Sequence, residues 1–164
     1  MDIVKWDDYF MSLSYLVATR SKDKNTHVGA VIVGPNKEIR STGYNSFPRG
    51  INDNVEERQE RPEKYYWMAH AEFNAVVLSS LVGVPLKGCT LYTNGIPCTN
   101  CAMAIINSGI KEVVVDQEWN DGNYGQWKEH AERTKQMFYE SYVTLRYWKG
   151  ELLGICKYRN GEKI

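Results

Sequence analysis

Three side chains of kinds that bind metal ions are divided between two distant segments of the chain. His70 stands in one segment, two residues before Glu72, and Cys98 and Cys101 stand in the other, one predicted helix and one predicted strand later. An imidazole and two thiolates bind a single ion only when the fold brings them together. Both segments begin predicted helices, and if these two helices lie side by side against a sheet, their N-termini can meet over one metal ion.

Hydrophobic periodicity predicts the elements that such an arrangement requires. Helical spacing predicts helices over residues 6–20, 69–81, 98–108 and 127–139, and short apolar runs predict strands over residues 28–33, 38–44, 89–93, 111–115 and 142–148. A further strand is expected after residues 149–151, ending near Tyr158. Strand–helix–strand order is typical of parallel pairing. The predicted fold class is therefore α/β, a three-layer α/β/α arrangement with a mixed five-stranded sheet.

The first two predicted helices each carry apolar side chains along one side. In residues 6–20 we expect this stripe to lie on the core, and it consists of Trp6, Tyr9, Phe10, Leu13, Leu16 and Val17. In residues 69–81 the corresponding side carries Phe73, Val76, Val77 and Leu81. Between the two helices, residues 45–64 are polar, charged and interrupted by Gly and Pro, which predicts a long functional or disordered loop.

Length and charge restrict the class of protein. A chain of 164 residues fits one domain, residues 1–164. Twenty Lys and Arg balance twenty Asp and Glu, so no net field attracts a long nucleic acid or an anionic membrane. The N-terminus lacks a secretory pattern and no apolar run is long enough to cross a membrane, so we expect a cytoplasmic protein. In a reducing compartment, the close pair Cys98 and Cys101 indicates metal or redox chemistry, whereas Cys89 and Cys156 are interpreted as core residues.

The ligand set indicates a catalytic zinc site. Two sulfurs and one imidazole leave a fourth position for water, whereas a closed structural site needs a fourth protein ligand. The start of a helix favours the thiolate forms of Cys98 and Cys101. Glu72 shares the first helical turn with His70 but points in another direction, so it can move protons beside the metal. We predict Zn²⁺ bound by His70, Cys98 and Cys101, with Glu72 as the catalytic residue.

His-x-Glu followed by Pro-Cys-x-x-Cys is the signature of zinc nucleobase deaminases. The chain resembles the cytidine and deoxycytidylate deaminase family, and in particular its deoxycytidylate (dCMP) deaminase branch. The resemblance extends over roughly residues 6–115 and includes Arg20-Ser21-Lys22-Asp23, Val28-Gly29-Ala30, Gly43-Tyr44-Asn45 and Gly109-Ile110-Lys111. It implies a cytidine deaminase-like fold and hydrolysis of dCMP to dUMP and ammonia, which supplies the precursor of dTMP. Glu72 would carry a proton from water to N3 of the cytosine ring.

The resemblance also implies contacts to the nucleotide. Eight residues are expected to make them: Lys22, Asn25, Val28, Gly29, Ala30, Asn45, Ala71 and Trp119. Asn45 would bind the sugar, and Trp119 would close over the substrate. Lys22 and Asn25 lie just upstream of the strand that lines the pocket, and this position predicts that they donate to the 5′-phosphate. Residues 46–64 would help to form an effector site for dCTP and dTTP. A homo-oligomer, commonly a hexamer, would complete each site.

Other functions remain open at this point. A redox dithiol is disfavoured because the Cys pair accompanies His70 and Glu72. A deaminase of tRNA adenosine, guanine, a free nucleoside or dCTP would have the same site, although zero net charge argues against tRNA. A non-catalytic zinc-stabilised binding module would have no use for Glu72. The other histidines, His27 and His130, are interpreted as a strand-entry residue and a helix-surface residue.

Overall fold

The structure, a computed structural model, describes residues 2–164. Its elements, in chain order, are α1 (Trp6–Ala18), β1 (Gly29–Val33), β2 (Ile39–Tyr44), the 3-10 helix η1 (Glu56–Gln59), α2 (Lys64–Trp67), α3 (Ala71–Val82), β3 (Thr90–Thr93), α4 (Thr99–Asn107), β4 (Glu112–Asp116), α5 (Gln117–Asp121), α6 (Gln126–Glu140), β5 (Thr144–Trp148), β6 (Tyr158–Arg159) and β7 (Glu162–Lys163). None of the helices in these residues combines the length and the apolar character needed to cross a membrane.

The central sheet is mixed and has five strands in the order β2-β1-β3-β4-β5. β1 pairs antiparallel with both β2 and β3, whereas β3, β4 and β5 pair in parallel. The parallel connections pass through α4 and α6, as expected for strands that need a crossover. The predicted fold class is therefore confirmed.

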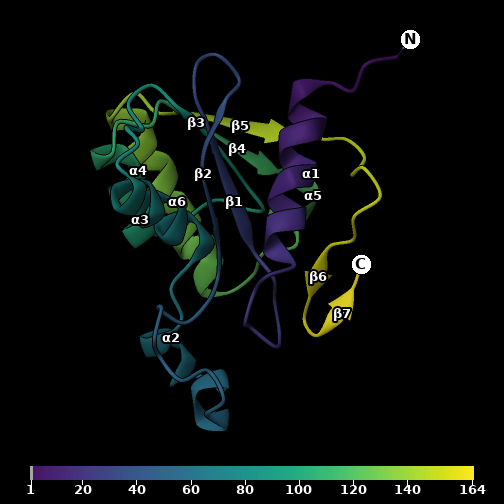
Figure 1. The fold of residues 1–164 in the computed structure, drawn as a ribbon, viewed down its shortest axis with the longest axis vertical. Helices are drawn as coiled ribbons and strands as arrows, with labels where there is room; N and C mark the ends of the chain where they lie inside the picture. The colour runs from purple at the N-terminus through teal and green to yellow at the C-terminus, as the bar shows by residue number, and fades with distance from the viewer. Residues whose placement is uncertain (1) are drawn as a thin grey trace.

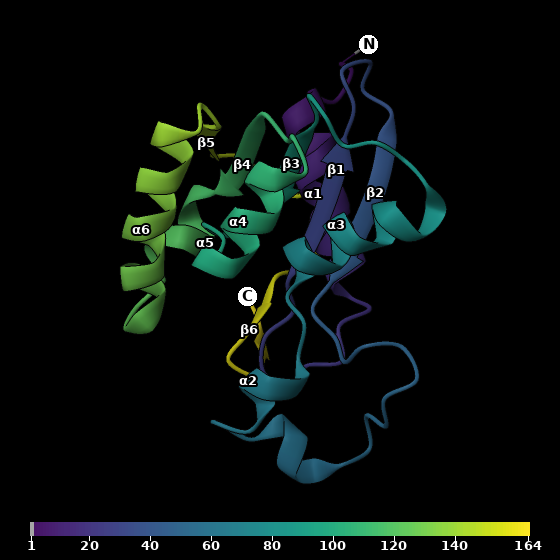
Figure 2. The ribbon, with the colours of Figure 1, turned by 90° about the vertical axis from the view of Figure 1, so that its left-hand side faces the viewer.

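Helices cover both faces of the sheet (Figure 1). α3, α4 and α6 lie on one face, and α1 and α5 lie on the other (Figure 1, Figure 2). Alternation along the strands supplies a separate core to each layer. In β1, Ala30 and Ile32 pack towards α3 and α4, while Val31 and Val33 pack towards α1. The strands are thus apolar on both sides, which places the polar chemistry at their ends.

The predicted buried stripe of α1 is wrong for three of its members. Trp6, Tyr9 and Leu16 are 54%, 40% and 53% exposed. The buried residues of α1 are Phe10, Met11, Ser12, Ser14, Tyr15 and Ala18. The cause is close backbone packing, because a Cβ atom on Gly29 would lie only 1.9 Å from the carbonyl oxygen of Ser14. Small side chains therefore face the sheet, and large ones are turned outward.

The same effect rotates α3. Phe73, Val77 and Leu81 are 45%, 45% and 68% exposed, so the apolar side noted in the sequence faces mainly away from the sheet. The buried side is formed by Ala71, Glu72, Ala75 and Ser79. A Cβ atom on Gly43 of β2 would lie 2.3 Å from the carbonyl oxygen of Ala71. Because the start of α3 packs closely on β2, Glu72 in the first turn of α3 is buried between the helix and the sheet.

The C-terminal segment differs from the prediction. The expected final strand is absent from residues 149–157, and β6 and β7 instead form a separate two-stranded sheet. Its turn is Asn160-Gly161, with φ angles of 55° and 81°, as the tight turn of a two-residue hairpin requires. The short helices α2 and α5 were not predicted either, because each is too short to show periodicity.

Candidate active site

The three predicted metal ligands converge where α3 and α4 begin. His70 is the N-cap residue of α3, Cys98 is the N-cap residue of α4, and Cys101 lies in the first turn of α4. His70 Nδ1 lies 3.3 Å from Cys98 Sγ and 3.6 Å from Cys101 Sγ. In the described residues this is the group of three potential ligands whose donor atoms all lie within 4.8 Å of one another.

This geometry fits zinc. Zinc–sulfur bonds of about 2.3 Å and zinc–nitrogen bonds of about 2.0–2.1 Å in a tetrahedron separate the sulfur and nitrogen atoms by about 3.5 Å. The two observed separations, 3.3 and 3.6 Å, bracket that value. The donor set of one imidazole and two thiols is also one that zinc prefers over magnesium or calcium.

The two thiols are unequal. A hydrogen bond from Cys101 is the main cause that lowers the pKa of Cys98 to about 4. The same interaction, followed by burial, raises the pKa of Cys101. The lowered pKa of Cys98 favours its thiolate, which is the form that binds metal ions.

Glu72 lies buried in the first turn of α3, 6% exposed. Burial is the main cause that raises the pKa of its carboxyl group, so the group holds a proton at a higher pH than a free carboxyl group does. The hydroxyl of Thr93 at the end of β3 lies 3.0 Å from Glu72 Oε1 and 3.0 Å from the carbonyl oxygen of Gly29. A hydroxyl has one proton and two lone pairs, so Thr93 can donate to the carboxylate or accept from the protonated acid while it donates to Gly29.

A pocket opens over this site, and its wall comes from six parts of the chain. The residues that line it are Asp23, Thr26, Val28, Asn45, Arg61, Lys64, Tyr65, Met68, His70, Ala71, Glu72, Gly95, Ile96, Pro97, Cys98, Trp119, Asn123, Tyr124, Trp127, Arg159 and Asn160. Four of the eight expected substrate contacts are among them: Val28, Asn45, Ala71 and Trp119. Gly29 and Ala30 continue from Val28 into β1 and are not on the wall.

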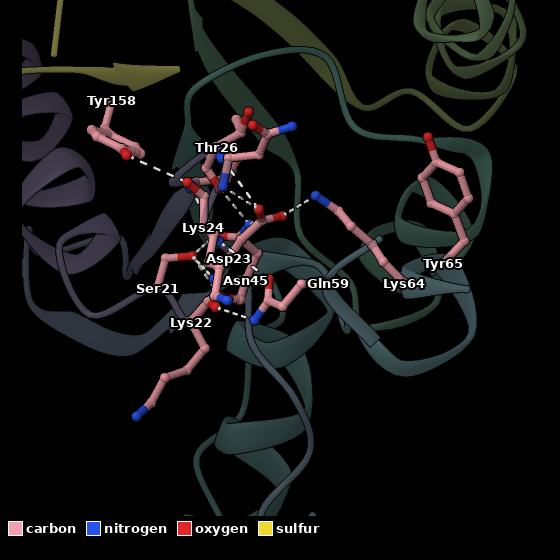
Figure 3. Close-up of polar contacts among 12 residues, drawn as sticks. Ser21, Lys22, Asp23, Lys24, Thr26, Asn45, Gln59, Lys64, Tyr65 and Tyr158 are labelled. Atoms are coloured by element: carbon pink, nitrogen blue, oxygen red, sulfur yellow. Dashed lines mark hydrogen bonds and ion pairs between the residues drawn. The ribbon is translucent and has the colours of Figure 1, made fainter. Parts of the chain in front are cut away.

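The side chain of Asn45 is engaged within the protein (Figure 3). Its Oδ1 accepts hydrogen bonds from Val28 N at 2.8 Å and Ser21 Oγ at 2.6 Å, and its Nδ2 donates to the carbonyl oxygen of Thr26 at 2.8 Å. Asn45 therefore fixes the loop of residues 21–28 against the end of β2. This contact shapes the pocket wall.

Lys22 and Asn25 lie outside the pocket wall. Lys22 Nζ is 3.2 Å from Asp53 Oδ2 and points away from the cluster around Asp23 (Figure 3). The backbone NH of Asn25 donates to Asp23 Oδ1, and its carbonyl oxygen accepts from Gly161 N at 2.8 Å. The two residues thus help to fold the loop that borders the pocket.

Several wall residues were missed by sequence reasoning, among them Thr26, Arg61, Lys64, Tyr124, Trp127 and Arg159. Lys64 and Tyr65 belong to α2, which projects with the rest of residues 46–68 beyond the end of the sheet (Figure 2). Arg159 comes from the C-terminal hairpin. Asn160-Gly161 was the signal that could have revealed this hairpin, since that dipeptide favours a type I′ turn.

The remaining histidines contact the edges of the site. His130 Nδ1 accepts a hydrogen bond from Thr99 N at 3.3 Å and so caps α4 beside Cys98. His27 stacks on Tyr158 of β6, with 4.1 Å between ring centroids. His130 is thus engaged at the start of α4, in addition to lying on the surface of α6.

Comparison with known proteins agrees with this geometry. Residues 4–117 match the family model described as the cytidine and deoxycytidylate deaminase zinc-binding region. Human deoxycytidylate deaminase is 42% identical over 118 residues, a match that spans 69% of this chain and 65% of the human protein. A protein of Aliivibrio fischeri, named as an uncharacterized deaminase in the luxG 3′ region, is 34% identical over 92% of this chain and 99% of its own length.

The fold has a close counterpart among solved structures. The dCMP deaminase of cyanophage S-TIM5, crystallised in complex with dCMP and dUMP, superposes with a TM-score of 0.71 at 22% identity, covering 90% of this chain and all of that one. The predicted family and the predicted Zn²⁺ cofactor are both confirmed by the family match and by the cluster of His70, Cys98 and Cys101. The chain belongs to the zinc-dependent cytidine and deoxycytidylate deaminase family.

Proposed function

We propose that this protein hydrolyses dCMP to dUMP and ammonia. The observation that carries the proposal is a buried carboxyl group, that of Glu72, beside a zinc-type ligand triangle at the base of a pocket that also contains arginine side chains. The relatives named deoxycytidylate deaminase support dCMP as the substrate. The match spans 65% of the human enzyme, which is less than two thirds of its length, so dCMP is proposed as the substrate of this chain.

Each group in the site has a distinct role in this reaction. Zinc, when bound by His70, Cys98 and Cys101, makes a water molecule acidic enough to lose a proton near neutral pH. Glu72 would take that proton on its carboxylate and deliver it to N3 of the ring, while the oxygen of the water adds to C4. A second proton, moved from this added hydroxyl to the amino group on C4, lets ammonia leave and leaves a carbonyl group at C4. The hydroxyl of Thr93 supports Glu72 in both protonation states by rotating between Glu72 and the Gly29 carbonyl oxygen.

The substrate contacts expected from the sequence form part of the proposal. Val28 and the backbone of Ala71 would border the base, and Trp119 would cover the nucleotide. Gly29 and Ala30, which follow Val28 behind the wall, remain a sequence-based prediction for the same part of the pocket. Asn45 would contact the sugar from the end of β2, where it also holds the loop of residues 21–28 in place. Lys22 and Asn25 remain the sequence-based prediction for the 5′-phosphate.

Regulation and assembly extend the proposal. dCTP and dTTP would act through residues 46–64, which contact the loop next to the pocket: Gln59 Nε2 donates to the carbonyl oxygen of Lys22 at 2.9 Å, and Lys24 Nζ pairs with Glu56 at 2.7 Å. The chain would form one domain, residues 1–164, in a homo-oligomer such as a hexamer. We further propose that it acts in pyrimidine metabolism in the cytoplasm.

A substrate panel tests the proposed activity. Ammonia release is measured for dCMP, CMP, dCTP, deoxycytidine, guanine and tRNA, with and without dCTP or dTTP as effectors. We expect kcat/KM to be highest for dCMP. A higher kcat/KM for guanine or tRNA would show that this compound, and not dCMP, is the preferred substrate. If no compound releases ammonia, the proposed deamination is wrong and the alternative of a zinc-stabilised binding module is favoured. If dCTP and dTTP leave kcat and KM for dCMP unchanged, the proposed regulation by these nucleotides is wrong.

A further inference from the structure

The C-terminal hairpin of β6 and β7 brings a charged residue, Arg159, into the pocket wall. This hairpin lies outside residues 4–117, which match the family model, and outside the central sheet. Its partners are two segments that themselves border the pocket, residues 24–27 and residues 116–123.

On one side the hairpin is bonded to the loop that follows α1. His27 N donates to the carbonyl oxygen of Tyr158 at 3.1 Å, and Gly161 N donates to that of Asn25 at 2.8 Å. The ring of Tyr158 stacks on His27, and its hydroxyl donates to the carbonyl oxygen of Lys24 at 3.3 Å (Figure 3). These bonds fix the backbone immediately before and after Arg159.

On the other side the hairpin is bonded to α5 and the end of β4. Lys157 Nζ forms an ion pair with Asp116 Oδ2 at 2.8 Å and also pairs with Glu118. Arg159 Nη1 donates to the carbonyl oxygen of Trp119 at 2.9 Å, and its Nη2 donates to Asn123 Oδ1 at 2.6 Å. The guanidinium also lies over the Trp119 ring, 4.6 Å from the centroid. Arg159 is thus held in one orientation before any ligand binds.

The glycine at position 122 makes room for this arrangement. A Cβ atom there would lie 2.7 Å from Arg159 Nη1. The guanidinium has five N–H groups, and its two hydrogen bonds within the protein leave three of them for a ligand. A fixed planar fork of this kind suits a phosphate group, which can accept two parallel hydrogen bonds.

The charges around the pocket favour an anion at Arg159. In residues 2–164, neither Arg159 nor the exposed Arg61 forms an ion pair with a carboxylate, whereas Lys64 is neutralised by Asp23 at 2.6 Å. The positive part of the wall is therefore the part formed by the arginines.

We propose that Arg159 determines specificity by binding the 5′-phosphate of the nucleotide. The inference rests on the proposed function and adds to it a residue from the C-terminal hairpin. The base then occupies the metal end of the pocket, and the phosphate lies against Arg159 where that side chain covers Trp119. Deoxycytidine, which lacks the phosphate, gains nothing from this contact.

Two measurements on the zinc-loaded protein test the inference. The first is the ratio of kcat/KM for dCMP to kcat/KM for deoxycytidine, and the second is the ratio of Kd for deoxyuridine to Kd for dUMP by calorimetry. We expect Arg159→Gln to lower both ratios about 10- to 100-fold, mainly through KM, as the loss of charge-assisted hydrogen bonds predicts. Arg159→Lys keeps the positive charge but lacks the planar guanidinium, so both of its ratios are expected to lie between those of the wild type and those of Arg159→Gln. Arg133→Gln, on the exposed side of α6, is the matched control.

The outcomes are distinguishable. If Arg159→Gln keeps both ratios of the wild type, the inference is overturned while the proposed deamination of dCMP stands. If the wild type releases no ammonia from dCMP, the proposed function fails, and the dUMP and deoxyuridine affinities still decide whether Arg159 binds a phosphate. Equal loss of affinity for dUMP and deoxyuridine in both Arg159 variants would mean that the hairpin merely supports the wall, which also overturns the inference.

Discussion

Lys64 and Asp23 form a buried ion pair, with 2.6 Å between Nζ and Oδ2 and side chains that are 8% and 4% exposed. The other oxygen of Asp23 accepts hydrogen bonds from the backbone NH groups of Asn25 and Thr26 (Figure 3). The pair therefore joins α2, at the end of the long projecting segment, to the loop after α1. Both partners line the pocket, so its wall depends on a contact between segments distant in sequence.

Replacing Lys64 is expected to destabilise the protein strongly. Lys64→Met leaves the Asp23 carboxylate buried without its cation, which costs about 3–5 kcal/mol. Lys24→Met, which breaks the exposed pair with Glu56, is the control and should cost less than about 1 kcal/mol. Urea unfolding measures both. Equal effects of the two variants would contradict a stabilising role of the buried pair, and Asp23→Asn combined with Lys64→Met should restore part of the loss.

Metal content depends on the ligand triangle. We expect about one zinc ion per chain, lost on His70→Ala, Cys98→Ala or Cys101→Ala, because two remaining ligands bind zinc too weakly to survive dialysis against a chelator. Cys156 is exposed, so its interpretation as a core residue is wrong, whereas Cys89 is buried as expected. Cys156→Ser should therefore leave the zinc content unchanged. Elemental analysis of the dialysed protein measures the number of zinc ions per chain. Zinc retained at full stoichiometry by Cys98→Ala would show that the ligands are other residues.

Glu72 should be required for turnover and dispensable for metal binding. Glu72→Gln keeps the shape and hydrogen bonding of the side chain but removes the proton acceptor, so kcat is expected to fall about 10²- to 10⁴-fold. Zinc content should stay at one per chain, since Glu72 is outside the ligand triangle. A variant with near wild-type kcat would exclude Glu72 as the proton carrier.

Thr93 offers a finer test of the same chemistry. Thr93→Val removes the hydroxyl that lies 3.0 Å from Glu72 Oε1, and we expect kcat to fall about tenfold, the effect of one lost hydrogen bond. KM and zinc content should stay close to wild type. Thr90→Val, on the same strand, removes a hydroxyl that contacts Glu112 instead and serves as control. If both variants lose kcat equally, the effect comes from the strand as a whole.

The ion pair of Asp7 with Arg146 should make stability depend on pH. Hydrogen bonds from Arg146, at 2.6 and 3.0 Å, are the main cause that holds the pKa of Asp7 below its usual 3.8. A lowered pKa in the folded state stabilises the protein above pH 3.8, and this contribution is lost as the pH falls through the lower value. Asp7→Asn should therefore cost up to about 1 kcal/mol at pH 7, because the pair is partly exposed. Unfolding curves should converge with those of the wild type only once the pH has fallen below the lowered pKa of Asp7; a constant difference at all pH values would contradict this.

Much of the fold was predictable because periodicity reports which segments are helix or strand. It did not predict which side of α1 or α3 is buried. Hydrophobic stripes assume that large apolar residues face the core, whereas Gly29 and Gly43 let the helix backbones approach so closely that only small side chains fit. Glycine in a strand was the signal for this close approach.

The candidate site divides in a similar way. The metal ligands and Glu72 could be predicted from the sequence, because their local spacing at the starts of two helices forms recognisable motifs. Asp23, Lys64 and Arg159 reach the pocket wall from three separate segments, which are the loop after α1, helix α2 and the C-terminal hairpin. Tertiary contacts place these segments, and no local pattern reports such contacts. The sequence-based prediction of a phosphate contact therefore named Lys22, because it lies close in sequence to the strand that lines the pocket. In the structure Lys22 pairs with Asp53 outside the pocket wall.

The projecting segment is closed at its base by two backbone hydrogen bonds. Ser46 N donates to the carbonyl oxygen of Ala69 at 3.1 Å, and Ala69 N donates to that of Ser46 at 2.9 Å. This bridge fixes the chain immediately before His70 whatever lies between its two ends. The residues between Ser46 and Lys64 could therefore vary in length without moving the metal ligands, provided that Lys64 still pairs with Asp23. The border of the pocket can then change while the chemistry stays the same.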